Sequence, residues 1–163
     1  MRIGILSDTH DEVARTTRAV RRLIAEGAEL LIHCGDLTTP EIVEEFAAIP
    51  TYFVFGNNDY AEGELRRAMN DVGGVCLGRA GEFTLVGKRL AVTHGDSVTQ
   101  FRRQMMGAPD YLFTGHTHVA LDERTGGTRH INPGALSRAR THTVALLDLH
   151  ADRLRMLTIH DNR

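Results

Sequence analysis

The chain has 163 residues, of which 42% are hydrophobic and 25% charged, and this predicts one domain, residues 1–163, with a buried core. A net charge of −2 at pH 7 provides no bulk attraction to nucleic acid or to an anionic membrane, and no apolar run reaches membrane-spanning length. Two cysteines outside any Cys-x-x-Cys pair, and an N-terminus unlike a signal peptide, predict a reduced, cytoplasmic protein.

The first half of the chain alternates predicted strands and helices. Short apolar runs predict strands at 2–7, 29–34 and 51–55. Apolar residues at helical spacing predict a helix at 12–26, and further helices are expected at 40–48 and 62–72. Thr39 and Pro40 are typical of an N-cap followed by a first helical residue, so we expect them to open the second helix.

The second half is predicted to be mainly strand. A tight turn at Gly87-Lys88 is expected to join strands at 82–86 and 89–93. A helix at 98–106 is followed by predicted strands at 111–114, 128–132, 143–149 and 154–160. This order favours an α/β sandwich with more than one sheet over a simple doubly wound sheet.

Side chains that ligate metals follow five of the predicted strands. These strand ends read Ser7-Asp8-Thr9-His10, Gly35-Asp36, Gly56-Asn57-Asn58-Asp59, Thr93-His94-Gly95-Asp96 and Gly115-His116-Thr117-His118. Sites in α/β proteins form beyond the carboxyl ends of strands, where loops gather side chains from several strands. Carboxylate, imidazole and amide ligands suit hard-to-borderline divalent metals. The five strand ends together therefore predict a metal centre.

Each of these motifs also has an ordinary structural explanation when it is taken alone. Asp8 could cap a helix, and Gly35-Asp36 and Gly56-Asn57-Asn58-Asp59 are good turn sequences. A single histidine such as His94 is more often structural than a ligand. The interpretation as a metal centre depends on all five motifs occurring in one chain.

In this order, the five motifs resemble the calcineurin-like metallophosphoesterases, and most of all their small prokaryotic phosphodiesterase branch. The resemblance covers the chain from Asp8 to Gly134. It implies an α/β fold, a four-layer α/β/β/α sandwich with two mixed β-sheets. It also implies two divalent metal ions per chain, with manganese as the first choice and iron, zinc, nickel or cobalt as alternatives.

Ligand sets follow from matching the motifs of this family. The resemblance implies that one metal is held by Asp8, His10, Asp36 and His118. It implies that the second is held by Asp36, Asn57, His94 and His116, so that Asp36 bridges the two ions. The implied activity is that of a phosphoesterase, first of all a phosphodiesterase acting on a small phosphoester, in which a metal-bridging hydroxide attacks phosphorus in line.

One position departs from the family pattern. The third motif usually reads Gly-Asn-His followed by Asp or Glu, whereas Asn58 occupies the histidine position here. An amide can donate a hydrogen bond but cannot act as a general acid, so Asn58 alone predicts slow turnover of esters with poor leaving groups.

Further candidates lie in the third motif and downstream of Asn132-Pro133-Gly134. The catalytic candidates are Asp36, Asn57, Asn58 and Asp59. The candidates for contact with the substrate phosphate are Asn58, Arg138 and Arg140, because arginine can hold a phosphate through two hydrogen bonds.

Two other functions stay open at this point. The same fold could serve as a catalytically weak or inactive protein-interaction scaffold, although a scaffold would tolerate loss of the seven candidate ligands. A nuclease or cyclic-nucleotide diesterase is the other alternative. Polynucleotide binding is less favoured because no basic run with interleaved aromatic residues occurs. A homo-oligomer is compatible with the family resemblance.

Overall fold

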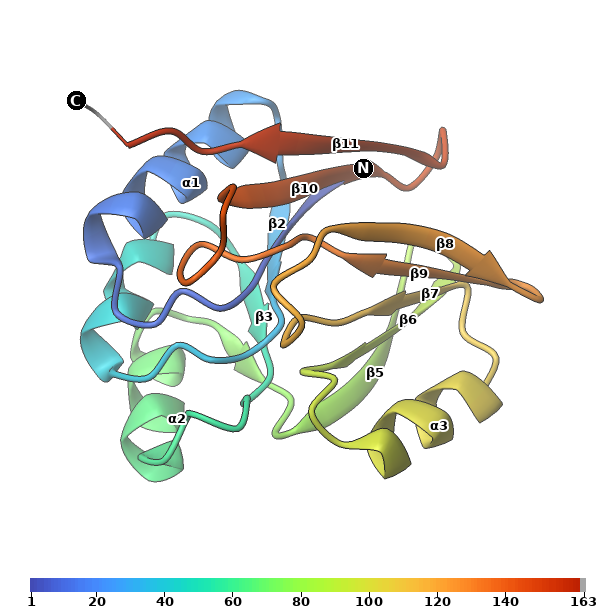
Figure 1. Cartoon of the computed structure of the whole chain (residues 1–163), viewed down its shortest axis with the longest axis horizontal. Coiled ribbons are helices and arrows are strands. Elements are labelled where there is room, and N and C mark those ends of the chain that lie inside the picture. The colour runs from blue at the N-terminus through green and yellow to red at the C-terminus, as the bar shows by residue number, and fades with distance from the viewer. Residues whose placement is uncertain (162–163) are drawn as a thin grey trace.

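Two β-sheets lie face to face in the computed structural model, which describes residues 1–161 (Figure 1). The six-stranded sheet has the order β11 (Arg153–Thr158), β10 (Thr143–Asp148), β1 (Arg2–Leu6), β2 (Leu30–His33), β3 (Thr51–Phe53), β4 (Val75–Cys76). The five-stranded sheet has the order β5 (Ala80–Leu85), β6 (Lys88–Thr93), β7 (Tyr111–Phe113), β9 (Thr128–Asn132), β8 (Leu121–Thr125). Each sheet combines parallel and antiparallel pairs, which confirms the predicted α/β fold with two mixed sheets.

Helices cover the outer faces of both sheets, which completes the four layers (Figure 1). The six-stranded sheet packs against α1 (Val13–Ala25), the 3-10 helix η1 (Pro40–Phe46) and α2 (Glu62–Asp71), whereas α3 (Val98–Met106) lies on the five-stranded sheet. Within residues 1–161, no helix has both the length and the apolar composition needed to cross a membrane.

The strands of the six-stranded sheet supply two separate cores because alternate side chains point to opposite faces. Ile3 and Ile5 of β1 belong to the core between the sheets, together with Val92 of β6. Leu6, the last residue of β1, belongs to the core between this sheet and its helices. Gly4 faces those helices, and a Cβ there would lie 2.9 Å from Leu23 of α1. Both faces of this sheet are therefore closely packed.

All the predicted helices and strands are present, with ends that shift by no more than two residues, but the second helix differs in type. Residues Pro40–Phe46 form a 3-10 helix rather than an α-helix reaching residue 48. Thr39 is extended, as expected before a helix, yet its side chain makes no capping hydrogen bond. Helices of the 3-10 type are frequent as connectors, and this one connects β2 to β3.

The turn of the β5–β6 hairpin was predicted one residue too late. Leu85 pairs with Lys88, so the turn residues are Val86 and Gly87, both with positive φ (45° and 76°). Two left-handed turn residues are typical of a type I′ hairpin, but a β-branched residue rarely adopts this conformation, so Val86 gave no indication of it.

Two strands were missed. The strand β4 has only two residues, and β8 is polar and mostly exposed, so neither has an apolar repeat. The Gly126-Gly127 pair between β8 and β9 was the available signal for that hairpin.

Candidate metal centre

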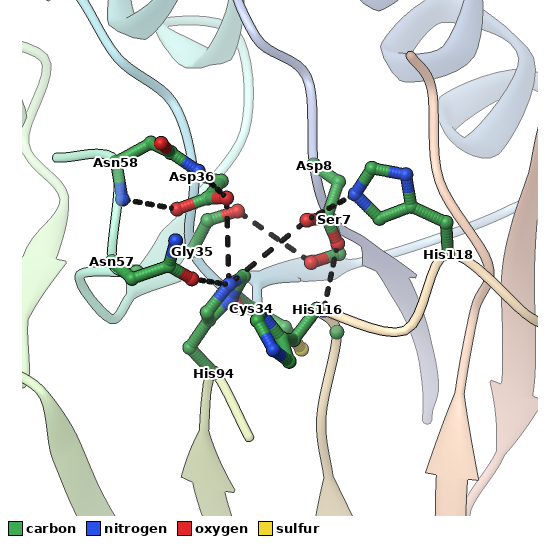
Figure 2. Close-up of polar contacts among 12 residues, drawn as sticks. Ser7, Asp8, Cys34, Gly35, Asp36, Asn57, Asn58, His94, His116 and His118 are labelled. Carbon is green, nitrogen blue, oxygen red and sulfur yellow. Dashed lines mark hydrogen bonds and ion pairs between the residues drawn. The ribbon is translucent and has the colours of Figure 1, made fainter. Parts of the chain in front are cut away.

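The loops that follow β1, β2, β3, β6 and β7 meet at the carboxyl ends of these strands, and Figure 2 shows Asp8, Asp36 and His94 turned toward one another. Loops of the six-stranded sheet carry Asp8, His10, Asp36 and Asn57. Loops of the five-stranded sheet carry His94, His116 and His118. The candidate centre therefore combines side chains from both sheets.

Asp8 lies beside three of the candidate histidines. Its Oδ1 is 3.1 Å from Nε2 of His118, 3.8 Å from Nε2 of His10 and 4.0 Å from Nε2 of His94. The groups Asp8, His10, His118 and Asp8, Asp36, His94 each place their ligand atoms within 4.8 Å of one another. Two Asp/His groups suitable for metal ions are thus present, and Asp8 belongs to both.

Asp36 lies between two of the histidines. Its Oδ2 is 3.4 Å from Nε2 of His10 and 3.5 Å from Nε2 of His94. The sequence predicted that Asp36 would bridge two ions. Asp36 contacts one histidine of each predicted ligand set, which fits a bridging position. The residue common to the two Asp/His groups described above is nevertheless Asp8.

Asn57 and His116 lie beside the two Asp/His groups. The Oδ1 atom of Asn57 is 3.0 Å from Nε2 of His94. The rings of His116 and His94 meet edge to face with centroids 5.1 Å apart, and the backbone N–H of His116 donates to Asp8 Oδ2. All seven predicted ligands are therefore gathered in one place.

Unsatisfied polar atoms mark this place as a site for cations. Both ring nitrogens of His10 are buried without a hydrogen-bond partner among the described residues, and Asp8 Oδ1 has only ion-pair contacts with neighbouring histidines. Leaving such groups unpaired costs roughly 1–3 kcal/mol each. Buried carboxylates and imidazoles with free lone pairs are the donor set that divalent transition metals take, so the residues present fit a metal centre.

The backbone is strained at the same residues. Positive φ angles occur at Asp8 (54°), His10 (40°), Asp36 (60°), His116 (66°) and His118 (59°). This left-handed conformation is uncommon for residues other than glycine and costs about 1 kcal/mol or more per residue. Strain concentrated in candidate ligands indicates a functional arrangement of these loops.

Asn58 and Asp59 hold the loops of the site together. Asn58 donates to both carboxylate oxygens of Asp36, through its backbone N–H at 2.8 Å and its Nδ2 at 2.7 Å (Figure 2). Asp59 accepts hydrogen bonds from the backbone N–H groups of Gly56, Asp36 and Thr38. Burial, its largest influence, raises the pKa of Asp59. Asp59 thus contacts the backbone of two loops rather than the other candidate side chains.

Arg138 and Arg140 are exposed. Within the described residues, neither guanidinium makes a hydrogen bond or ion pair with the candidate ligands. The backbone carbonyl of Arg138 instead lies 3.3 Å from Nδ1 of His118. Arg138 therefore contacts the site through its main chain.

Two supporting contacts were missed by the sequence reasoning. The carbonyl oxygen of Cys34 lies 2.8 Å from Nδ1 of His94, which leaves Nε2 directed toward Asp36. Asn132 donates from Nδ2 to the carbonyl of Gly115 and to Thr117 Oγ1, within the loop that carries His116 and His118. A backbone acceptor such as Cys34 has no sequence signature, whereas Asn132 lies in the Asn-Pro-Gly segment noted above.

Comparison with known proteins identifies the family. Residues 1–152 match the calcineurin-like phosphoesterase superfamily domain. The chain belongs to the calcineurin-like phosphoesterase superfamily. It is 28% identical to phosphodiesterase MJ0936 of Methanocaldococcus jannaschii, covering 98% of this chain and 99% of that protein. It is 31% identical to the probable metallophosphoesterase YsnB of Bacillus subtilis, covering 93% of this chain and 86% of that protein.

A solved structure supports the same assignment. The structure of an archaeal phosphodiesterase aligns with a TM-score of 0.90 at 26% identity, covering 98% of this chain and 100% of that chain. This calcineurin-like phosphoesterase homologue thus has the fold of its family and carries Asp/His groups suited to metal ions.

Protonation of His94 gives a prediction for metal binding by this phosphoesterase homologue. Burial opposes its charge, but the hydrogen bond with Asp36 and the charges of Asp8 and Asp36 prevail and raise the pKa of His94 to about 9. Without metal, His94 is therefore protonated near neutral pH. A metal must displace that proton, so we expect the apparent affinity to increase as pH rises toward about 9.

Isothermal titration calorimetry in buffers of different ionisation enthalpy measures this proton release directly. About one proton released per chain from His94 is expected near neutral pH. Binding without proton release, at an affinity that does not change with pH, would contradict the prediction.

Proposed function

We propose that this protein is a divalent-metal-dependent phosphodiesterase that hydrolyses small phosphoesters. In the proposed reaction, water attacks phosphorus directly and in line, with no covalent enzyme intermediate. The observation that carries the proposal is the convergence of two Asp/His groups, sharing Asp8, at strand ends from both sheets. The similarity to an archaeal phosphodiesterase supports the choice of reaction.

The proposed ligand sets are those implied by the family motifs. One ion would be held by Asp8, His10, Asp36 and His118, and the other by Asp36, Asn57, His94 and His116. Two bound divalent cations would lower the pKa of a shared water and offset negative charge on the phosphoryl oxygens. Manganese is the first choice, with iron, zinc, nickel and cobalt compatible with the same donors.

Residues of the chain would hold this arrangement ready before substrate binds. Asn58 restrains both oxygens of Asp36, and the carbonyl groups of Cys34 and Arg138 orient the rings of His94 and His118. Burial opposes ionisation of Asp8 and Asp36, yet the neighbouring histidines hold the pKa of each carboxyl below its usual range. Both side chains therefore carry negative charge at neutral pH, as cation binding requires.

The burial of Ser7 and Cys34 supports attack by water rather than by either of these side chains. Ser7 directly precedes Asp8, Cys34 lies two residues before Asp36, and both are fully buried. Ser7 Oγ lies 3.5 Å from the carbonyl of Gly35, and burial raises the pKa of the Cys34 thiol well above its ordinary value. Neither side chain is suited to attack phosphorus.

The exposure of His116 supports a substrate that approaches from solvent. A cavity of about 290 Å³ elsewhere in the molecule contains none of the candidate ligands and is lined by Arg2, Glu26, Leu146, Asp148, Arg153 and Arg155. The chemistry of the donors, rather than the size of that cavity, supports the site proposed here. An open site would accept varied leaving groups, so model diesters should be hydrolysed.

Removal of the metal tests the proposed function. The protein is treated with a chelator, and hydrolysis of bis-p-nitrophenyl phosphate is measured before and after addition of Mn²⁺. We expect activity to disappear with the metal and to return with Mn²⁺, because both the attacking water and the phosphoryl charge depend on the ions. A folded protein inactive with Mn²⁺, Fe²⁺, Zn²⁺, Ni²⁺ and Co²⁺ would instead favour the interaction scaffold.

A further inference from the structure

The position that carries a histidine in the family motif cannot supply a proton here. Asn58 occupies that position, and its Nδ2 and backbone N–H are both directed to Asp36. An amide does not act as a general acid. Hydrolysis of a poor leaving group still benefits from protonation of the departing oxygen, so another side chain is needed for that step.

The acidic side chains of this loop region are unsuited to the task. Asp8 and Asp36 are candidate ligands of the metal ions, and a carboxyl group that binds a metal is deprotonated. Asp59 is only 1% exposed, and its two oxygens accept three backbone N–H groups. None of these carboxyl groups presents a proton to a bound substrate.

Tyr60 is the remaining proton donor in the same loop. Its hydroxyl lies 3.4 Å from Asn58 Oδ1, at the far end of the amide whose nitrogen donates to Asp36. A hydrogen-bonded chain thus runs from the phenol of Tyr60 through Asn58 to the candidate metal centre.

The backbone at Tyr60 is fixed by hydrogen bonds, whereas its side chain is exposed. The backbone N–H of Tyr60 donates to the carbonyl of Asn58, and the preceding residue, Asp59, is anchored by three backbone N–H groups. The side chain itself is 85% exposed, so it can turn toward a substrate at the cost of little packing and of the 3.4 Å hydrogen bond to Asn58.

We propose that Tyr60 protonates the leaving-group oxygen, a role that rests on the proposed phosphodiesterase function. As the oxygen of water bonds to phosphorus, the bond from phosphorus to the leaving oxygen breaks. The phenolic proton passes to that oxygen, and the product departs as a neutral alcohol or phenol. The phenolate regains a proton from solvent, which also receives the proton lost by the attacking water.

The consequence concerns the dependence of rate on the leaving group. Asn58 alone predicts a steep fall in rate as the leaving group becomes poorer. With Tyr60 as proton donor, we expect the rate of the native protein to fall only slightly as the leaving group becomes poorer. The steep fall is expected in Tyr60→Phe.

The test compares native protein and Tyr60→Phe on methyl aryl phosphates whose leaving phenols range from p-nitrophenol to unsubstituted phenol. Loss of general acid catalysis should lower kcat for the phenol ester on the order of 10²-fold, with the p-nitrophenol ester changed by less than about twofold. KM should stay unchanged. Tyr52→Phe is the matched control, because the Tyr52 ring stacks on Phe83 at 4.2 Å.

The possible outcomes separate the inference from the function on which it rests. An equal fall in kcat for every ester would make Tyr60 a positioning residue for Asn58 and overturn the proposal, as would no fall at all. Native protein inactive toward the whole series with each divalent metal would instead overturn the phosphodiesterase function itself.

Discussion

Asp36→Asn is expected to lower kcat/KM for bis-p-nitrophenyl phosphate at least ~10³-fold and to reduce the number of metal ions bound per chain. Asp36 is almost fully buried, with Oδ2 within 3.5 Å of both His10 and His94. Asparagine removes one negative charge and can turn an N–H group toward these histidines. Stabilisation by metal ions is worth several kcal/mol, and a factor of 10³ corresponds to about 4 kcal/mol.

Steady-state kinetics and metal analysis of the purified variant measure both effects. Asp71→Asn, the same chemical change at an exposed residue that ends α2, is the matched control and should retain native activity. Circular dichroism checks that both variants are folded. If Asp36→Asn kept more than about a tenth of the native kcat/KM with full metal content, Asp36 would not be a bridging ligand.

Gly56→Ala is expected to destabilise the protein and weaken metal binding together. A Cβ at Gly56 would lie 2.2 Å from Asp36 Oδ1 and 2.6 Å from the backbone nitrogen of Asp36. The backbone N–H of Gly56 also donates to Asp59, so the loop cannot move away without losing that bond. Overpacking of this kind costs roughly 1–3 kcal/mol of the free energy of unfolding.

Urea unfolding of the metal-free protein measures the loss of stability without interference from bound ions. Gly63→Ala provides the control, because an added Cβ there has no atom within 4 Å and lies in α2. Alanine in place of glycine in a helix is expected to raise stability by up to about 1 kcal/mol. Equal stability of Gly56→Ala and native protein would show that the Asp36 loop yields to the added carbon.

Much of the fold follows from short-range patterns in the sequence. Apolar runs located β1, β2 and β7, and helical spacing located α1 and α3, because burial on one or two faces imposes a regular period. The apolar pattern gave no indication of β8, because its residues are mostly exposed. It also misplaced the hairpin turn at Val86, where pairing along the whole β5–β6 ladder overrides a local preference.

In the candidate site, the residue types could be predicted from the sequence, but the backbone geometry could not. Residue types at strand ends were sufficient to predict which side chains would gather. They gave no indication of the left-handed backbone at Asp36 and His116, because such strain is imposed by neighbouring loops rather than by local propensity. The sharing of Asp8 between the two Asp/His groups also depends on how loops from different sheets are placed relative to one another.

The supply of side chains by both sheets makes metal binding part of the folding equilibrium. The predicted ligands of each ion come from loops of both sheets, so the site exists only when the two sheets are assembled. A ligand that binds only the assembled state adds about 2.7 kcal/mol to the free energy of unfolding at a hundred times its dissociation constant. Each ion would thus act as a reversible cross-link between the sheets, and the free energy of unfolding would rise with the concentration of free metal.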